Sequence, residues 1–166
     1  GHAMTVMEFV PGGSLRDAVE AEAPFPLRRA INYMREMLVA VAFMHQGVTV
    51  NGEHRSVVHR DLKPSNVLIS VQQRADRVKH VLKITDFGLA VEVGDFLKWA
   101  EAGGDLAYQA PESFLQSRCT PTSDVYALGL IFYEMVSGRC PFRGVGARLS
   151  GSQAERHTEL NELHTR

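Results

Sequence analysis

The strongest constraint on the fold is one apolar stretch in the last third of the chain. Residues 125–133 are apolar or glycine at every position, and Ser137-Gly138 ends the pattern. A helix that is apolar on every face must be buried on every face. The stretch is shorter than the roughly 18 apolar residues that a membrane-spanning helix needs. Residues 124–136 therefore predict a buried helix at the centre of a mainly helical core.

Other segments carry the patterns of further helices and strands. In residues 27–45 apolar side chains recur every three or four positions, which predicts a long helix with one buried face. Ser14 and Asp17 have the spacing of a capping box and predict the start of a short helix. Short apolar runs predict strands at 5–10, 57–58, 67–69 and 81–85, and polar stretches predict loops at 47–56 and 71–80.

The composition is that of one folded domain. Of 166 residues 45% are apolar, and the formal net charge is −1, which excludes a fully disordered chain. This charge gives no electrostatic reason to expect nucleic acid or a membrane as a partner. Only Cys119 and Cys140 are present, too few for a disulfide framework, so we expect a reducing, cytoplasmic location. Residues 144–166 change to Gly, Ser, Glu and Arg and predict a flexible tail.

Three motifs with chemical potential follow one another along the chain. They are His59-Arg60-Asp61-Leu62-Lys63-Pro64-Ser65-Asn66, Asp86-Phe87-Gly88 and Ala110-Pro111-Glu112. Phosphoryl transfer needs a carboxylate that orients the attacking hydroxyl, cations that neutralise phosphates, and oxygen ligands for Mg²⁺. Either Asp61 or Asp86 alone is more simply explained as a turn former. Their occurrence together and in this order favours the chemical interpretation.

The three motifs together resemble the signature set of the protein kinases. The Lys63-Pro64 pair resembles the serine/threonine kinases and differs from the pattern usual in tyrosine kinases. The resemblance covers residues 5–143 as a partial domain. It implies an α+β fold, namely the mostly helical large lobe of a kinase with a remnant strand of the small lobe. It also implies ATP and Mg²⁺ as cofactors, a protein substrate, and transfer of the γ-phosphoryl group to a serine or threonine hydroxyl.

The resemblance assigns the catalytic and metal-binding roles residue by residue. Asp61 is expected to act as the catalytic base, and Lys63 to meet the γ-phosphate. Asn66 is expected in the catalytic set and, with Asp86, as a ligand of Mg²⁺. Asp124 matches a buried family aspartate that holds the backbone of the His59-Arg60-Asp61 turn. An aspartate at this place can also be a plain helix N-cap, and both interpretations can hold together.

The resemblance also places the adenine of ATP. Residues 7–15 look like the kinase hinge, with the backbone of Glu8 and Val10 bonding adenine and Leu68 lying beneath it. The alternative for this segment is an edge strand followed by a turn. His59 and Phe87 resemble two members of the stacked apolar spine of kinases.

Several parts of the family pattern do not occur in these 166 residues. No Gly-rich phosphate loop, no lysine of the V-A-I-K type and no partner glutamate precede the hinge. We therefore expect this chain alone to be inactive. Two interpretations stay open: a fragment of an active kinase, or a truncated or pseudokinase-like module that acts by binding a partner, such as a regulatory protein.

The segment before Ala110-Pro111-Glu112 departs from the pattern as well. Asp105 stands where serine/threonine kinases usually carry threonine, so its carboxylate could pair with Lys63 or repel Asp61. Residues 89–110 contain no serine or threonine, and Tyr108 is their only hydroxyl. Activation by phosphorylation of a serine or threonine in this segment is therefore not expected.

Overall fold

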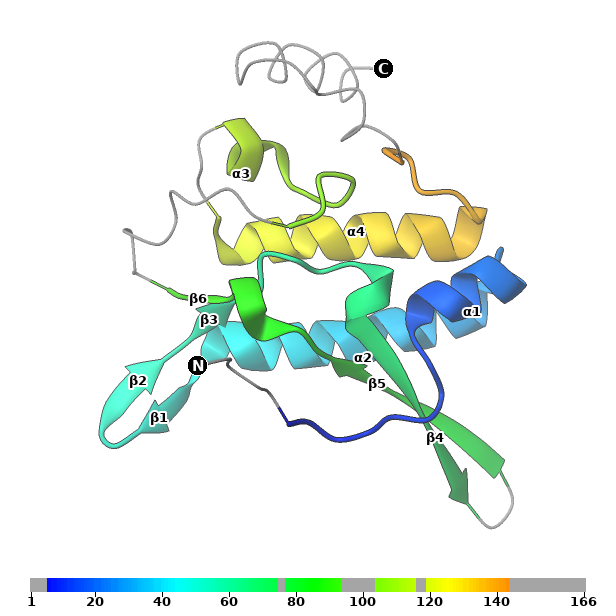
Figure 1. The fold of residues 1–166 in the computed structure, drawn as a ribbon, viewed down its shortest axis with the longest axis horizontal. Helices are drawn as coiled ribbons and strands as arrows, with labels where there is room; N and C mark the ends of the chain where they lie inside the picture. The colour runs from blue at the N-terminus through cyan, green and yellow to red at the C-terminus, as the bar shows by residue number, and fades with distance from the viewer. Residues whose placement is uncertain (1–5, 75–76, 94–103, 116–118, 144–166) are drawn as a thin grey trace.

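The computed structural model describes residues 6–74, 77–93, 104–115 and 119–143 (Figure 1). The flexible tail expected at 144–166 lies outside these residues. No helix within the described ranges is long and apolar enough to cross a membrane.

Two long helices form the centre of the molecule. Helix α2 spans Leu27–Gln46 and helix α4 spans Pro121–Ser137, and they pack side by side (Figure 1). The predicted positions of both helices are confirmed. The shorter helices are α1, Leu15–Glu22, which begins with the predicted Ser14–Asp17 capping box, and α3, Pro111–Leu115.

Helix α4 lies in the core, as its composition predicts, but it is not buried on every face. Leu128, Ile131 and Met135 are at most 1% exposed. Val125 and Tyr133, in contrast, are 51% and 48% exposed. The prediction of burial all round is therefore wrong for one face of α4, because the described residues pack against the other faces only.

In the described part of the chain, three pairs of antiparallel strands lie beside the helices. Strand β1 (Val48–Val50) pairs with β2 (Glu53–Arg55), and β3 (Val57–Val58) pairs with β6 (Val91–Glu92). The longest pair joins β4 (Val67–Arg74) to β5 (Arg77–Ile84), with Val67 opposite Ile84. A single turn of 3-10 helix, η1 (Pro64–Asn66), follows the His59-Arg60-Asp61 turn, here called the catalytic turn, and another, η2 (Phe87–Leu89), follows β5.

Two segments that the sequence predicts as loops are hairpins instead. In 47–56 the turn falls at Asn51-Gly52, where both residues have positive φ, which is the geometry of a tight hairpin turn. In 71–80 the strands β4 and β5 continue outward as a two-stranded ribbon. A ribbon of this kind can form from polar residues, because much of its surface faces solvent.

The remnant strand predicted at 5–10 does not form. Residues 6–10 belong to no strand, and Val6 and Phe9 are 86% and 85% exposed. A strand needs a neighbour for its backbone hydrogen bonds, and no described strand pairs its backbone with residues 6–10. The α+β, kinase-like and mostly helical character of the fold does not depend on it.

Candidate active site

The carboxylate of Asp124 holds the catalytic turn in place. One oxygen accepts from the backbone N–H of His59 at 2.8 Å, and the other accepts from that of Arg60 at 3.0 Å. Arg60 has φ 70°, a left-handed conformation that is uncommon for residues other than glycine. Asp124 is 1% exposed, and its two bonds compensate the cost of a buried charge. The predicted support of the turn by Asp124 is therefore confirmed.

Two histidines extend this support on either side of the turn. His45, at the end of α2, places Nε2 2.8 Å from Asp124 Oδ2. The buried ring of His59 contacts the backbone oxygen of Thr85 at 3.0 Å and packs on Phe87, with ring centroids 5.0 Å apart. The His59–Phe87 contact expected from the spine resemblance is present. His45 was not singled out from the sequence, because a lone histidine at the end of a helix carries no signal there.

Asp61 lies at the centre of a small polar network. Its Oδ1 accepts from the backbone N–H of Asp105 at 2.9 Å. Its Oδ2 accepts from Asn66 Nδ2 at 3.0 Å and lies 2.8 Å from Lys63 Nζ. The structure thus brings the three predicted catalytic residues together, with Asp61 only 7% exposed.

Asn66 and Asp86 lie at the same end of the β4–β5 hairpin. Asn66 immediately precedes β4, and Asp86 comes two residues after β5 ends. The backbone N–H of Thr85 donates to the carbonyl of Asn66 at 3.0 Å, which closes this end. Asp86 is exposed, has φ 64°, and accepts from the Gly88 N–H at 3.4 Å. Two residues with oxygen-bearing side chains, from different motifs, therefore lie at one end of the hairpin.

The segment expected to hold adenine lies along β4. The Gly13 carbonyl accepts from the Ile69 N–H at 2.9 Å, and Ser14 forms an isolated bridge with the half-buried Leu68. A Cβ at Gly12 would come within 2.0 Å of the Ile69 carbonyl oxygen, so only glycine allows this approach.

The side chain of Glu8 is exposed and bonds the ammonium of Lys83 on β5 at 2.6 Å. Val10, two residues further, is half-buried. Lys83 was not identified from the sequence, since nothing in the spacing links residues so far apart.

The structure corrects the expectation that Asp105 pairs with Lys63. The ammonium of Lys63 pairs with Asp61, and the Asp105 carboxylate accepts from the backbone N–H of Ala107 at 3.0 Å. Its own backbone N–H donates to Asp61. Gly104 approaches the same turn closely, because a Cβ there would lie 2.8 Å from the Arg60 carbonyl oxygen. The backbone of 104–105 is thus part of the site, through the Asp105 N–H and not through the side chain that the sequence pointed to.

A second buried network fixes the segment after Asp105. The phenol of Tyr108 donates to Glu134 Oε2 on α4, and Arg16 on α1 donates to both the phenol and Glu134 Oε1. Burial and the bond to Glu134 raise the pKa of Tyr108. Burial lowers the pKa of Arg16, but its bonds to Glu134 and Tyr108 raise it by more. The one hydroxyl of residues 89–110 is therefore engaged in the core.

The arrangement around Asp61, Asp86 and Asp124 is that of the large lobe of a protein kinase. The family model described as the protein kinase domain matches residues 1–164, so the chain belongs to the protein kinase family. Within that family the chain is similar to bacterial serine/threonine kinases.

Three of these relatives indicate how far the similarity extends. The chain is 34% identical to serine/threonine-protein kinase PrkC of Bacillus subtilis over 144 residues, which are 86% of this chain and 20% of that protein. It is 33% identical to serine/threonine-protein kinase A of Synechocystis over 164 residues, 97% of this chain and 31% of that protein. It is 36% identical to serine/threonine-protein kinase PknB of Mycobacterium tuberculosis over 143 residues, which are 84% of this chain and 20% of that protein. The chain thus spans between a fifth and a third of their length.

Proposed function

We propose that the protein containing this chain transfers the γ-phosphoryl group of ATP to a serine or threonine hydroxyl of a protein substrate. The observation that carries this proposal is the network around Asp61. A nearly buried carboxylate is fixed by three donors there, and one of them is the ammonium of Lys63 at 2.8 Å. The names and similarity of the bacterial relatives support the choice of serine or threonine.

In this proposal Oδ1 of Asp61 is the atom that orients the acceptor hydroxyl. Among the described residues Oδ2 is close to both Asn66 and Lys63, whereas Oδ1 accepts only from the Asp105 N–H. A carboxylate oxygen has two lone pairs, so Oδ1 keeps one for the substrate hydroxyl and its proton. Lys63, with its side chain 24% exposed, can reach a phosphate from the same loop.

The residues at the hairpin end fit Mg²⁺ bound to a nucleotide. The amide nitrogen of Asn66 donates to the carbonyl and the carboxylate of Asp61, which leaves the amide oxygen for a cation. Asp86 offers a carboxylate that only the Gly88 N–H contacts among the described residues. No cluster of three or more His, Cys, Asp or Glu side chains in the described ranges could hold a metal alone. Mg²⁺ suits such a site, since it commonly takes one or two protein oxygens and completes its shell with phosphates and water.

The same proposal places adenine beside the backbone of Glu8 and Val10, above Leu68. Its support is the contact of residues 13–14 with β4, which brings this segment next to Leu68. A cytoplasmic location belongs to the proposal too, and is supported by Cys119 and Cys140, which are free thiols. A regulatory protein partner, and the lack of nucleic-acid or membrane partners, remain predictions.

The metal and nucleotide roles are tested by titrating Mg·ATP into the 166-residue chain and recording NMR spectra. We expect weak Mg²⁺-dependent binding, on the order of 1 mM, since no phosphate loop covers the nucleotide. Asp86→Ala should remove the Mg²⁺ dependence, because it deletes the anionic ligand. Asp61→Asn is the matched control and should leave binding nearly unchanged. Equal weakening by both substitutions, or no Mg²⁺-dependent shift in the wild type, contradicts the assignment.

The transfer step is measured with the whole protein, ATP labelled at the γ-phosphate, and peptides that offer serine, threonine or tyrosine. We expect label on serine or threonine. Asp61→Asn should lower the rate by about 100-fold or more, as for loss of a general base. Label on tyrosine only, or a rate unchanged by Asp61→Asn, refutes the proposed function.

A further inference from the structure

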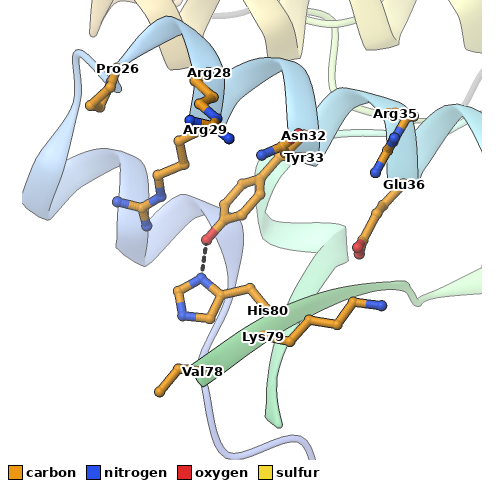
Figure 2. Close-up of a pocket in the computed structure, with 10 residues that line it drawn as sticks. All are labelled: Pro26, Arg28, Arg29, Asn32, Tyr33, Arg35, Glu36, Val78, Lys79 and His80. Atoms are coloured by element: carbon orange, nitrogen blue, oxygen red, sulfur yellow. Dashed lines mark hydrogen bonds between the residues drawn. The ribbon is translucent and has the colours of Figure 1, made fainter. Parts of the chain in front are cut away.

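A groove of about 860 Å³ lies between the N-terminal half of α2 and strand β5 (Figure 2). None of the proposed catalytic, metal-binding or adenine-binding residues lines it. At its centre the phenol of Tyr33 on α2 contacts His80 on β5, which ties the two walls together. The groove is therefore a feature distinct from the site around Asp61.

The walls of this groove concentrate positive charge in a chain whose net charge is −1. Four cationic side chains line it, together with one carboxylate, Glu36. Arg29 is already engaged, since it bonds Glu22 and lies over the rings of Phe25 and Tyr33. Three cations remain, and none forms an ion pair with another described residue: Arg28, Arg35 and Lys79.

These three cations come from both walls. Arg28 and Arg35 are exposed on α2, and Lys79 is exposed on β5 (Figure 2). Glu36 forms no ion pair with any of the three, and its carboxylate accepts instead from the backbone N–H of Leu82 at 2.8 Å. The groove therefore presents to an anionic ligand, from two sides, positive charge that no described residue pairs.

The contact between Glu36 and Leu82 also shows which edge of β5 is open. Among the described strands β5 pairs only with β4, and the Leu82 N–H points to the opposite edge. Backbone groups of every second residue in a strand face the same edge. His80 and Val78 therefore direct their N–H and C=O groups to the edge that lines the groove. Val78 is 54% exposed, so a ligand can reach this part of β5.

We propose that this groove binds an extended acidic segment of a partner protein, which pairs as an added strand with the outer edge of β5. Its backbone matches the alternating donors and acceptors of Val78 and His80. Its carboxylates match Arg28, Arg35 and Lys79. A peptide fits better than a nucleic acid, because a sugar–phosphate backbone offers no N–H donors to the carbonyls of the edge. The proposal does not depend on phosphoryl transfer.

The proposal is tested by fluorescence anisotropy with a short labelled peptide in which Glu alternates with Val. Alternation places all the carboxylates on one face of a strand. The Arg35→Gln/Lys79→Gln double variant should bind about fivefold to tenfold more weakly, as expected for the loss of two exposed ion pairs. The matched control is Arg55→Gln/Arg139→Gln, which removes the same charge from positions outside the groove and should bind as the wild type does. Circular dichroism checks that all variants keep the fold.

Strand pairing is tested with the peptide rather than with the protein. Methylation of alternate backbone nitrogens on the peptide's pairing edge removes the donors that β5 needs, and it should abolish binding. A peptide with Gln in place of Glu should also fail to bind. Equal loss in the two double variants, undiminished binding of the methylated peptide, or preferential binding of a single-stranded oligonucleotide overturns the proposal.

Discussion

At the scale of single residues, Tyr108 joins its own segment to two helices that lie far apart in the sequence. Its phenol contacts Arg16 of α1 and Glu134 of α4, and the residue is 4% exposed. The neutral phenol fits this place, because a phenolate would lie buried against the carboxylate of Glu134. The position of the backbone around Asp105, which bonds Asp61, therefore depends on a protonated side chain three residues away.

This arrangement predicts a stability loss at high pH. Burial and the bond to Glu134 raise the pKa of Tyr108 above that of an unfolded tyrosine, which is about 10. The contribution of the neutral phenol is therefore fully present below about pH 10 and is lost as the pH rises further. Urea unfolding followed by circular dichroism should show a falling free energy of unfolding above about pH 10, with a smaller slope in Tyr108→Phe.

Tyr133→Phe is the control, because it removes a phenolic hydroxyl from a residue of α4 that is 48% exposed. At neutral pH we expect Tyr108→Phe to cost about 1 kcal/mol, because Arg16 and Glu134 lose a hydrogen-bond partner. An alkaline slope unchanged by Tyr108→Phe contradicts the role given to this phenol.

At the scale of elements, the close approach of residues 12–14 to β4 sets the position of the proposed adenine segment. An added Cβ at Gly12 meets the Ile69 carbonyl oxygen at 2.0 Å, so one of the two backbones has to move. Gly12→Ala should lower the free energy of unfolding by about 1–3 kcal/mol. It should also weaken nucleotide binding, which NMR titration measures, because the segment that carries Glu8 and Val10 shifts.

The control for this prediction is another glycine-to-alanine change. Gly129 lies within helix α4, and a Cβ added there would meet open space within 4 Å. Gly129→Ala should therefore raise the free energy of unfolding by up to about 1 kcal/mol, the ordinary gain of alanine within a helix. Stabilisation by both substitutions contradicts the close packing of Gly12.

The sequence predicts the helices of this fold better than its hairpins. Residues 27–45 and 124–136 carry dense apolar patterns, and both segments form the expected helices. The β4–β5 ribbon projects with polar residues along it, so its outer part lacks the alternation that indicates a strand. For β1–β2 a signal was present in Asn51-Gly52, a dipeptide that favours tight hairpin turns.

For the candidate site, prediction from the sequence is limited by the sequence separation of the residues that contact one another. Asp61 and Asn66 occur within one motif, and Asp124 matches a single position of the family pattern. The structure brings Asp61 to Asn66 and joins Asp124 to the catalytic turn. Arg16 bonds partners 92 and 118 residues away. No local period or motif encodes such pairs, because only the packing of α1 on the rest of the fold brings them together.

At the scale of the whole molecule, an apolar groove of about 710 Å³ is open along α2, β5 and η2. Val39, Phe43 and Phe87 line it and are 67%, 63% and 49% exposed. Clustered apolar surface of this kind favours association. We expect the 166-residue chain to self-associate, with an average mass in sedimentation equilibrium that rises with concentration.

The Val39→Lys/Phe43→Lys variant should reduce this association, because it places charge in the groove without removing a buried side chain. The association of this variant is compared with that of Phe9→Lys, which places a charge outside the groove, at a residue that is 85% exposed on the segment before α1. A monodisperse monomer at high concentration, with the wild type and both variants alike, contradicts the expectation.

The bonds that Asp124 makes to the catalytic turn also have a consequence for hydrogen exchange. The amide hydrogens of His59 and Arg60 are donated to a carboxylate carried by α4, rather than to a neighbouring strand. Such amides exchange with solvent only when the element that holds their acceptor moves away. Protection of these two amides therefore follows the opening of α4, so the catalytic turn and the central helix open as one cooperative unit.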